Sequence, residues 1–236
     1  YGVPLAAFAA AGITPDAVVH MVNDGALEAA DRTVLSPTTL AEARQAEVRG
    51  LFTSLVPPHE ATPPMEVVFR NAPGVGANAF ALPGGTIIVT DQLIDIASSD
   101  DEIAGVLAHE IGHVEQRHGL QQIYRALGLT AMAMLVSGDT GQLVHDVINQ
   151  AAVLQTFAYA REFEAAADSR SVAIMLAAHR NPVAFVDLLD RIAGSEQTGD
   201  PGMLSTHPGN RERRTAVEKQ VEELCPQCLK RSQDGP

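Results

Sequence analysis

The chain has 236 residues, 46% of them hydrophobic, which is enough to bury one substantial core. Its 29 acidic and 16 basic residues give a net charge of −13, so nucleic acid is not expected as a partner. No apolar run reaches the roughly 18 to 20 residues that a membrane-spanning helix needs, and the chain as given is expected to be soluble.

The N-terminal quarter is predicted to be helical. Thr14 and Ser36 each precede a proline, which is typical of an N-cap followed by proline in the first turn, and helices are expected near residues 15–30 and 37–55. The chain begins at Tyr1 rather than Met and continues with apolar residues. We therefore expect a fragment whose upstream signal or anchor has been removed, and such an anchor would associate the protein with a membrane.

The next segments predict a small sheet followed by a helix. Four prolines interrupt residues 57–64, after which β-branched or alternating residues predict strands at 65–70 and 86–90. Ser98 and Ser99 are suitable N-caps, acidic residues fill positions 100–102, and Gly119 is a natural stop. A helix is therefore predicted from about residue 100 to residue 118.

This helix carries the pentapeptide His109-Glu110-Ile111-Gly112-His113. Two histidines four residues apart lie on one helical face and can share one cation, for which Zn²⁺ is suited. Glu110 then lies beside the metal, where a carboxylate can take a proton from a bound water. The alternative is a core helix whose histidines recur at this spacing without binding a metal.

Further helices are expected near residues 120–136, 141–157, 159–178, 182–194 and 210–224, with a long loop at 194–208. The apolar run 126–136 is predicted to be buried, and the alternative is a hairpin touching a bilayer surface. Together these elements predict an α+β, mostly helical fold with a small mixed sheet packed against the helix of the pentapeptide. One domain is expected, with a helical part at 1–60, a core at 65–224 and a tail at 225–236.

A third ligand is needed, because catalytic zinc normally has three protein ligands. In the expected helix 159–178, Glu164 and Asp168 share one face, whereas Glu162 lies about 200° around the helix from Glu164 and cannot serve the same metal. A solvated acidic face is the alternative for Glu164 and Asp168. The metzincin pattern is excluded, since it requires Gly at position 116 and His at 119, where the chain has Gln116 and Gly119.

Four ordered blocks resemble a known family. They are the pentapeptide, Glu164 and Asp168 with Arg161 three residues before, the run Asn78-Ala79-Phe80-Ala81-Leu82-Pro83-Gly84-Gly85, and Thr206-His207-Pro208 followed by Arg213. The chain is similar here to the gluzincin zinc metallopeptidases that include the CAAX prenyl protease, the membrane protease HtpX and the periplasmic protease BepA. Residues before about 60 and the C-terminal cysteines fall outside this resemblance.

The resemblance implies a zincin-like fold, one Zn²⁺ per chain and a role for each matching residue. His109, His113 and Glu164 would be the metal ligands and Glu110 the general base, with Asp168, Arg161 and Arg213 around them. It also implies hydrolysis of extended peptide or protein substrates in a bacterial envelope, periplasmic or membrane-anchored. The sequence gives no prediction of oligomeric state, natural substrate or cleavage preference.

Four expectations stay more open. Substrate is expected to add a strand beside Ala77, Asn78, Ala79 and Phe80. His207 would donate a hydrogen bond to the developing oxyanion, or occupy the fourth zinc position and hold the enzyme closed, or be a structural loop histidine that does neither. His118 is expected to face the far side of the helix, as a C-terminal cap or dipole partner. Cys225 and Cys228 would form a terminal disulfide or an inert thiol pair.

Two other functions are open. A zinc-containing binding module could hold unfolded envelope proteins without cutting them, although Glu110 argues against it. A zinc hydrolase acting on a non-peptide amide is the other.

Overall fold

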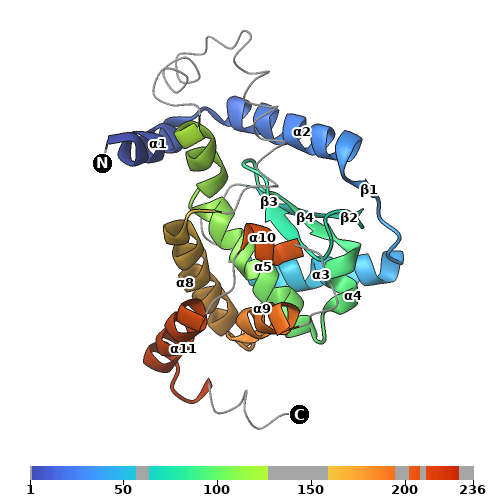
Figure 1. Cartoon of the computed structure of the whole chain (residues 1–236), viewed down its shortest axis with the longest axis vertical. Helices are drawn as coiled ribbons and strands as arrows, with labels where there is room; N and C mark the ends of the chain where they lie inside the picture. Colours follow the sequence, from blue (N-terminus) through green and yellow to red (C-terminus); the bar gives the residue numbers. More distant parts are fainter. Residues whose placement is uncertain (1, 57–63, 127–158, 195–201, 208–210, 229–236) are drawn as a thin grey trace.

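The computed structural model describes residues 2–56, 64–126, 159–194, 202–207 and 211–228 (Figure 1). The helix expected at 141–157, most of the one at 120–136 and half of the loop at 194–208 lie outside these residues. The helices are α1 (Gly2–Ile13), α2 (Asp16–Thr33), α3 (Glu42–Leu55), α4 (Asp91–Ile96), α5 (Asp100–Glu115), α8 (Arg161–Ala177), α9 (Ala184–Gly194), α10 (Gly202–Thr206) and α11 (Arg211–Leu224). The strands are β1 (Ser36–Pro37), β2 (Glu66–Asn71), β3 (Ala79–Ala81) and β4 (Thr86–Thr90).

The described strands form one mixed sheet in the order β1-β2-β4-β3. β2 runs parallel to β4, while β1 and β3 pair antiparallel with β2 and β4 respectively. The two strands expected from the sequence appear as β2 and β4, and the prediction of an α+β fold with a small mixed sheet is confirmed. β3 lies at one edge of this sheet, next to α5.

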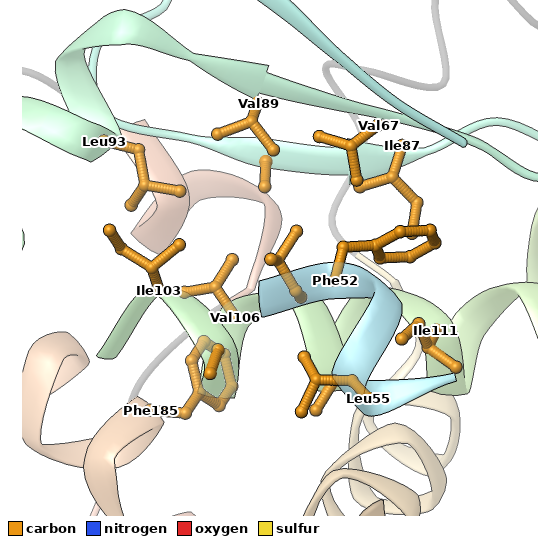
Figure 2. Close-up of a cluster of buried hydrophobic side chains, with 14 of the residues drawn as sticks. Phe52, Leu55, Val67, Ile87, Val89, Leu93, Ile103, Val106, Ile111 and Phe185 are labelled. Atoms are coloured by element: carbon orange, nitrogen blue, oxygen red, sulfur yellow. The ribbon is translucent and has the colours of Figure 1, made fainter. Parts of the chain in front are cut away.

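Side chains cover both faces of the sheet. On one face, Val67, Ile87 and Val89 pack with residues of α3, α5 and α9, as Figure 2 shows for Phe52, Val106 and Phe185 among others. On the other face, Phe80 and Ile88 pack with apolar residues of α1 and α2 and with Leu120, Ile123 and Tyr124. Because apolar burial stabilises a fold in proportion to the area removed from water, the first cluster fixes α5 beneath the sheet and the second fixes α1 and α2 on the other face.

α5 and α8 approach each other closely. A Cβ added at Gly112 would lie 3.1 Å from both the Cα and the carbonyl oxygen of Ala167. Small residues at both positions therefore let the two backbones come into contact. Gly112 is inside the pentapeptide and Ala167 is between Glu164 and Asp168, so this contact brings the two motifs together.

The N-terminal region differs from the prediction in two ways. The helix expected from residue 37 begins at Glu42, because Ser36 and Pro37 instead pair with Asn71 and Arg70 of β2. Helix α1 has no counterpart among the expected helices, since its almost wholly apolar sequence has no helical periodicity to read. Among the described residues no single helix is long and apolar enough to cross a membrane, and only Pro4–Ile13 with Asp16–Thr33, bent by 104°, meets that test as a pair.

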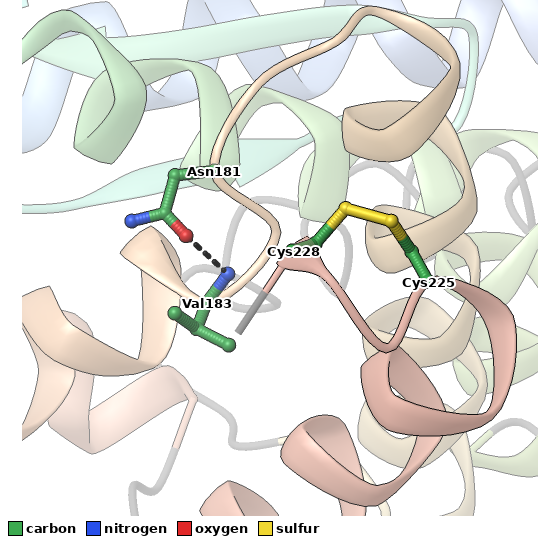
Figure 3. The surroundings of a disulfide bond; sticks show 4 residues. All are labelled: Asn181, Val183, Cys225 and Cys228. Carbon is green, nitrogen blue, oxygen red and sulfur yellow. Dashed lines mark hydrogen bonds between the residues drawn. A yellow bond between two sulfur atoms is a disulfide. The ribbon is translucent and has the colours of Figure 1, made fainter. Parts of the chain in front are cut away.

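The C-terminal cysteines form a disulfide after α11, which is one of the two alternatives left by the sequence (Figure 3). Cys228 packs against a small cluster that joins α8, α9 and α11. Beside it, the side-chain oxygen of Asn181 accepts a hydrogen bond from the backbone N–H of Val183, at 3.2 Å. The division into one domain with a tail at 225–236 stays a prediction.

Candidate active site

Helix α5 places the pentapeptide at the centre of the fold. Ser99 caps the helix, its hydroxyl accepting from the N–H of Glu102, and three acidic residues occupy the first turn as predicted. His109 and Glu110 are completely buried and His113 is 1% exposed. The helix does not continue to Gly119 as expected but ends at Glu115. The reason is local, because Arg117 adopts a left-handed φ of 52° and turns the chain before residues 118–126 resume as a helix.

Four side chains converge beside α5, and we call them the ligand cluster: His109, His113, Glu164 and His207. The Nε2 atoms of His109 and His113 lie 3.0 Å apart. Glu164 Oε1 lies 3.4 Å from His113 Nε2, and Glu164 Oε2 lies 3.5 Å from His109 Nε2. His207 Nδ1 lies 3.3 Å from His109 Nε2 and 3.0 Å from Glu164 Oε1.

The spacing of these atoms fits a zinc ion. Bonds of about 2.0–2.1 Å in a tetrahedral site separate the ligand atoms by about 3.3 Å. The ligand-cluster distances run from 3.0 to 3.5 Å and scatter around this value. Imidazole nitrogens and a carboxylate oxygen are also donors that zinc accepts. The cluster therefore has the donor types and a spacing suited to one zinc ion, with its four donor atoms all within 4.8 Å of one another.

Asp168 and Arg213 lie on the Nδ1 side of His109, away from the metal position. Asp168 Oδ1 lies 3.0 Å from His109 Nδ1, so that Nε2 of the ring faces the ligand cluster. Arg213 of α11 donates to both oxygens of Asp168, from Nε at 2.5 Å and from Nη2 at 2.6 Å. Its Nη1 lies 3.0 Å from Glu164 Oε2, and its guanidinium lies 5.0 Å from the ring centroid of Phe185. Arg213 thus links the two carboxylates of α8.

The two α5 histidines of the cluster have pKa values shifted in opposite directions. Burial lowers the pKa of His109, but its hydrogen bonds to Asp168 and Glu164 outweigh burial and raise this pKa to about 9. For His113 burial dominates, and its pKa lies well below the ordinary value. Burial raises the pKa of Glu164, yet the surrounding histidines more than offset this and lower it. Without metal, a proton on His109 therefore compensates part of the buried negative charge.

Glu110 has the environment of a proton acceptor. Its two carboxylate oxygens are buried without a hydrogen-bond partner among the described residues, and His207 Nε2 lies 3.4 Å from Oε1. Burial raises the pKa of Glu110, with partial opposition from His207 and His109. A carboxylate with a raised pKa is a better base for a proton transfer near neutral pH.

Helix α10 brings His207 to the cluster. The N–H of Met203 donates to the carbonyl of Ala77 at 2.8 Å, and the Thr206 hydroxyl donates to the side-chain oxygen of Asn78 at 3.3 Å. His207 itself is completely buried. The sequence predicted only a loop here, because a five-residue helix gives no periodic pattern. Helix α10 is therefore held by hydrogen bonds to Ala77 and Asn78, the two residues that precede β3.

Residues 39–221 match the sequence model of peptidase family M48. The chain belongs to this family. The match covers the pentapeptide, Glu164 with Asp168, strand β3 and His207 of the α10 region. Family membership confirms the predicted zinc metallopeptidase domain.

Curated relatives carry related descriptions. The mitochondrial metalloendopeptidase OMA1 of Schizosaccharomyces pombe is 30% identical over 151 residues, which cover 62% of this chain and 44% of that protein. The metalloprotease LoiP of Escherichia coli is 29% identical over 140 residues, 58% of this chain and 55% of LoiP. The β-barrel assembly-enhancing protease of Yersinia pestis is 27% identical over 169 residues, 66% of this chain and 35% of that protein. The chain thus spans about half the length of these relatives or less.

Among the three predicted residues that would surround the metal ligands, Arg161 is exposed, whereas Asp168 and Arg213 are buried. Arg161, the first residue of α8, is exposed and lines a cavity of about 380 Å³ between α8 and α11. Glu164, Asp168 and Arg213 line the same cavity, so it reaches the ligand cluster. Glu162 is also exposed and accepts a hydrogen bond from Arg125 at 2.8 Å, pointing away from Glu164 as its helical position requires.

Sequence reasoning missed two aromatic neighbours of the ligands. Tyr159 stacks on His113 with ring centroids 4.1 Å apart, and Phe185 lies 4.6 Å from His109. The expectation for His118 was wrong, because this side chain is 2% exposed and its Nδ1 lies 3.0 Å from His113 Nδ1. The error came from extending the 100° rotation per residue past Glu115, where the helix has already ended.

Proposed function

We propose that the chain is a zinc-dependent metalloendopeptidase that hydrolyses peptide bonds of protein substrates. The observation that carries this proposal is the buried Glu110, without a hydrogen-bond partner among the described residues, directly beside four converging zinc-type donors. A purely structural zinc site does not require a carboxylate base beside its ligands. The relatives named as metalloproteases support the same activity.

Each residue has a role in this reaction. Zinc, held by His109, His113 and Glu164, would supply a Lewis acid that polarises the scissile carbonyl and acidifies the attacking water. Glu110 takes the proton of the water and returns it to the leaving amine. Asp168, fixed by Arg213, holds the His109 ring with Nε2 toward the cluster.

His207 has two roles compatible with its position. Its Nδ1 completes the ligand cluster, which favours a resting state in which this imidazole occupies the fourth position. Once displaced, it would be near enough to donate to the oxyanion. His207→Ala tests the first role, since the variant should change the zinc coordination number and raise basal activity. Unchanged coordination together with unchanged basal activity would rule that role out.

Extended substrate is proposed to pair with the β3 edge. Hydrogen bonds join Thr90 to Asn78 and Leu82 to Thr86, so the antiparallel alternation turns the peptide groups of Ala79 and Ala81 away from β4. Ala79 is buried and its N–H donates to the side-chain oxygen of Asn78 at 2.9 Å, so substrate would have to displace this contact. Strand addition there recognises peptide backbone with little sequence preference.

Ala79→Pro tests this pairing, because it removes an edge N–H, which in the structure donates to Asn78 Oδ1, without removing a ladder bond. We expect weaker binding of a casein-derived peptide to the Glu110→Gln protein when Ala79→Pro is added, with zinc affinity unchanged. Peptide binding that survives Ala79→Pro would count against the edge as the substrate site.

Casein cleavage tests the activity itself. The wild type should cleave casein, chelation should abolish cleavage, and Glu110→Gln should lower it by a factor of about 10² to 10⁴, the usual contribution of a general base. Glu162→Gln is a matched control, because Glu162 is an exposed glutamate beside the site that faces away from the cluster. A wild type that holds one zinc and cleaves neither casein nor other peptides would favour the binding module or an amide hydrolase of another class.

The setting is proposed to be the bacterial cell envelope, in protein quality control, either periplasmic or membrane-anchored. The relative named as a β-barrel assembly-enhancing protease supports this setting, whereas the relatives named OMA1 are described as mitochondrial. Fractionation of the native host tests it, and recovery of the protein in the cytosol would count against it.

A further inference from the structure

His118 is a buried histidine that the proposed reaction does not use. It is the first residue of the helical segment 118–126, it is 2% exposed, and its Nδ1 lies 3.0 Å from Nδ1 of His113. The other ring nitrogen of His113, Nε2, faces the ligand cluster. His118 therefore contacts a proposed zinc ligand on the side opposite the metal position.

An imidazole that binds zinc through Nε2 needs a hydrogen-bond acceptor at Nδ1, and His118 can be this acceptor for His113. A neutral His113 that binds through Nε2 carries its proton on Nδ1, and this N–H needs an acceptor. Among the described residues, His118 Nδ1 is within hydrogen-bond distance and can accept it. His109 has the equivalent acceptor in Asp168 Oδ1, at 3.0 Å from its Nδ1. Both histidines of the pentapeptide are thus supported at Nδ1, one by a carboxylate and the other by an imidazole.

We propose that His118 is a positioning residue that holds His113 in the Nε2-binding tautomer and ring orientation. This proposal rests on the zinc site of the proposed function and adds a residue to it. His118 acts through His113 and does not itself contact substrate or the reacting atoms.

One ring contact and two features of the preceding residue hold His118 in place for this role. Its ring stacks on Phe163, with centroids 4.2 Å apart and planes 15° from parallel. The left-handed turn at Arg117 reverses the chain so that His118 points back toward His113. Arg117 Nη1 in turn donates to the carbonyl of Ala11 at 2.8 Å, which ties this turn to the end of α1. A side chain fixed by stacking and by the backbone on both sides can set the orientation of its partner ring.

Two substitutions separate the acceptor from the packing. His118→Phe keeps an aromatic ring against Phe163 and removes the acceptor, whereas His118→Asn retains an oxygen close to the position of Nδ1. Zinc affinity of the full chain is measured by competition with a chelator of known affinity. We expect His118→Phe to weaken zinc binding by about 10-fold to 100-fold, the usual effect of losing an outer partner of a ligand.

His118→Asn should restore most of this affinity, and His20→Phe, on an exposed face of α2, should leave it unchanged. An affinity of His118→Phe equal to that of the wild type would overturn the proposal, as would equal losses in the Phe and Asn variants. A wild type that binds no zinc at all would instead overturn the proposed function, so the two failures are distinguishable.

A measurement on the unaltered protein covers the case in which His118→Phe does not fold. Ring ¹⁵N spectra of the zinc-loaded wild type should show His113 protonated at Nδ1 and His118 protonated at Nε2, with His118 Nδ1 unprotonated. A proton on His118 Nδ1 would overturn the proposal, because that nitrogen could then no longer accept from His113.

Discussion

Arg213→Met should destabilise the metal-free protein far more than the same substitution at the next residue, Arg214. Each arginine has three carboxylate contacts given by the structure. Those of Arg213 go to Asp168 twice and to Glu164 once. Those of Arg214 go to Asp187, Asp190 and Glu218. The arginine side chains differ in exposure, 7% for Arg213 and 25% for Arg214.

The magnitude follows from burial. Removing one partner of a buried ion pair leaves an uncompensated charge and costs about 3–5 kcal/mol. In a chain of this length each kcal/mol lowers the melting temperature by about 2–4 °C, so Arg213→Met should lower it by roughly 6–20 °C. The partners of Arg214 are 44% or more exposed, and surface pairs contribute about 0–1 kcal/mol each. The three pairs of Arg214 together should therefore contribute about 0–3 kcal/mol, so Arg214→Met should cost less than Arg213→Met.

Urea denaturation of the chelated wild type and both variants measures these free energies of unfolding. Arg213→Lys adds a second comparison, because lysine keeps the charge and loses the two-pronged contact with Asp168. Equal losses at Arg213 and Arg214 would refute the argument that burial, and not the number of contacts, decides the stability contribution.

Three further outcomes are expected. Gly112→Ala should cost about 1–3 kcal/mol, because its Cβ would meet the α8 backbone at 3.1 Å, whereas Gly50→Ala, where nothing lies within 4 Å, should gain about 0.5–1 kcal/mol in the same urea titration. Folding raises the pKa of His109 from 6.5 to about 9, so protonated His109 stabilises the metal-free protein. This contribution is complete below pH 6.5 and is lost as the pH rises through 9. Denaturation of the chelated protein should therefore show a loss of roughly 2 kcal/mol between pH 7 and 9.5, while zinc affinity should fall as the pH falls below 9; a flat profile for both would contradict the assignment. Ser99→Ala should cost about 1 kcal/mol through the loss of the α5 cap, measured against Ser98→Ala, and no loss would show that the cap is dispensable.

The parts of the site that depend on helical periodicity were predictable from the sequence. His109, Glu110 and His113 follow from spacing on one helix, and Glu164 and Asp168 follow from spacing on another. Joining the two helices at one metal required the family resemblance, because periodicity says nothing about which helices pack together. The contact that joins them, Gly112 on Ala167, becomes visible only in the structure.

The parts that were missed depend on short or irregular segments. α10 is five residues long, too short to give a periodic pattern. α1 is almost entirely apolar, so no polar face marks it as a helix. His118 was misplaced because one left-handed residue, Arg117, ends the regular rotation of α5, and arginine is not a residue whose presence indicates such a turn.

The backbone contact between α5 and α8 also limits which ion the cluster can accept. Two ligand atoms come from α5 and one from α8, and at Gly112 the helices are already at van der Waals distance. Exchanging rotamers cannot bring the helices closer, and moving them apart would open the packed core between them. An ion with longer bonds, such as Ca²⁺ at about 2.3–2.6 Å from its oxygen ligands, would need ligand atoms farther apart than those of a zinc site. Two small residues that are not among the metal ligands, Gly112 and Ala167, thus set the helix separation on which the ligand spacing depends.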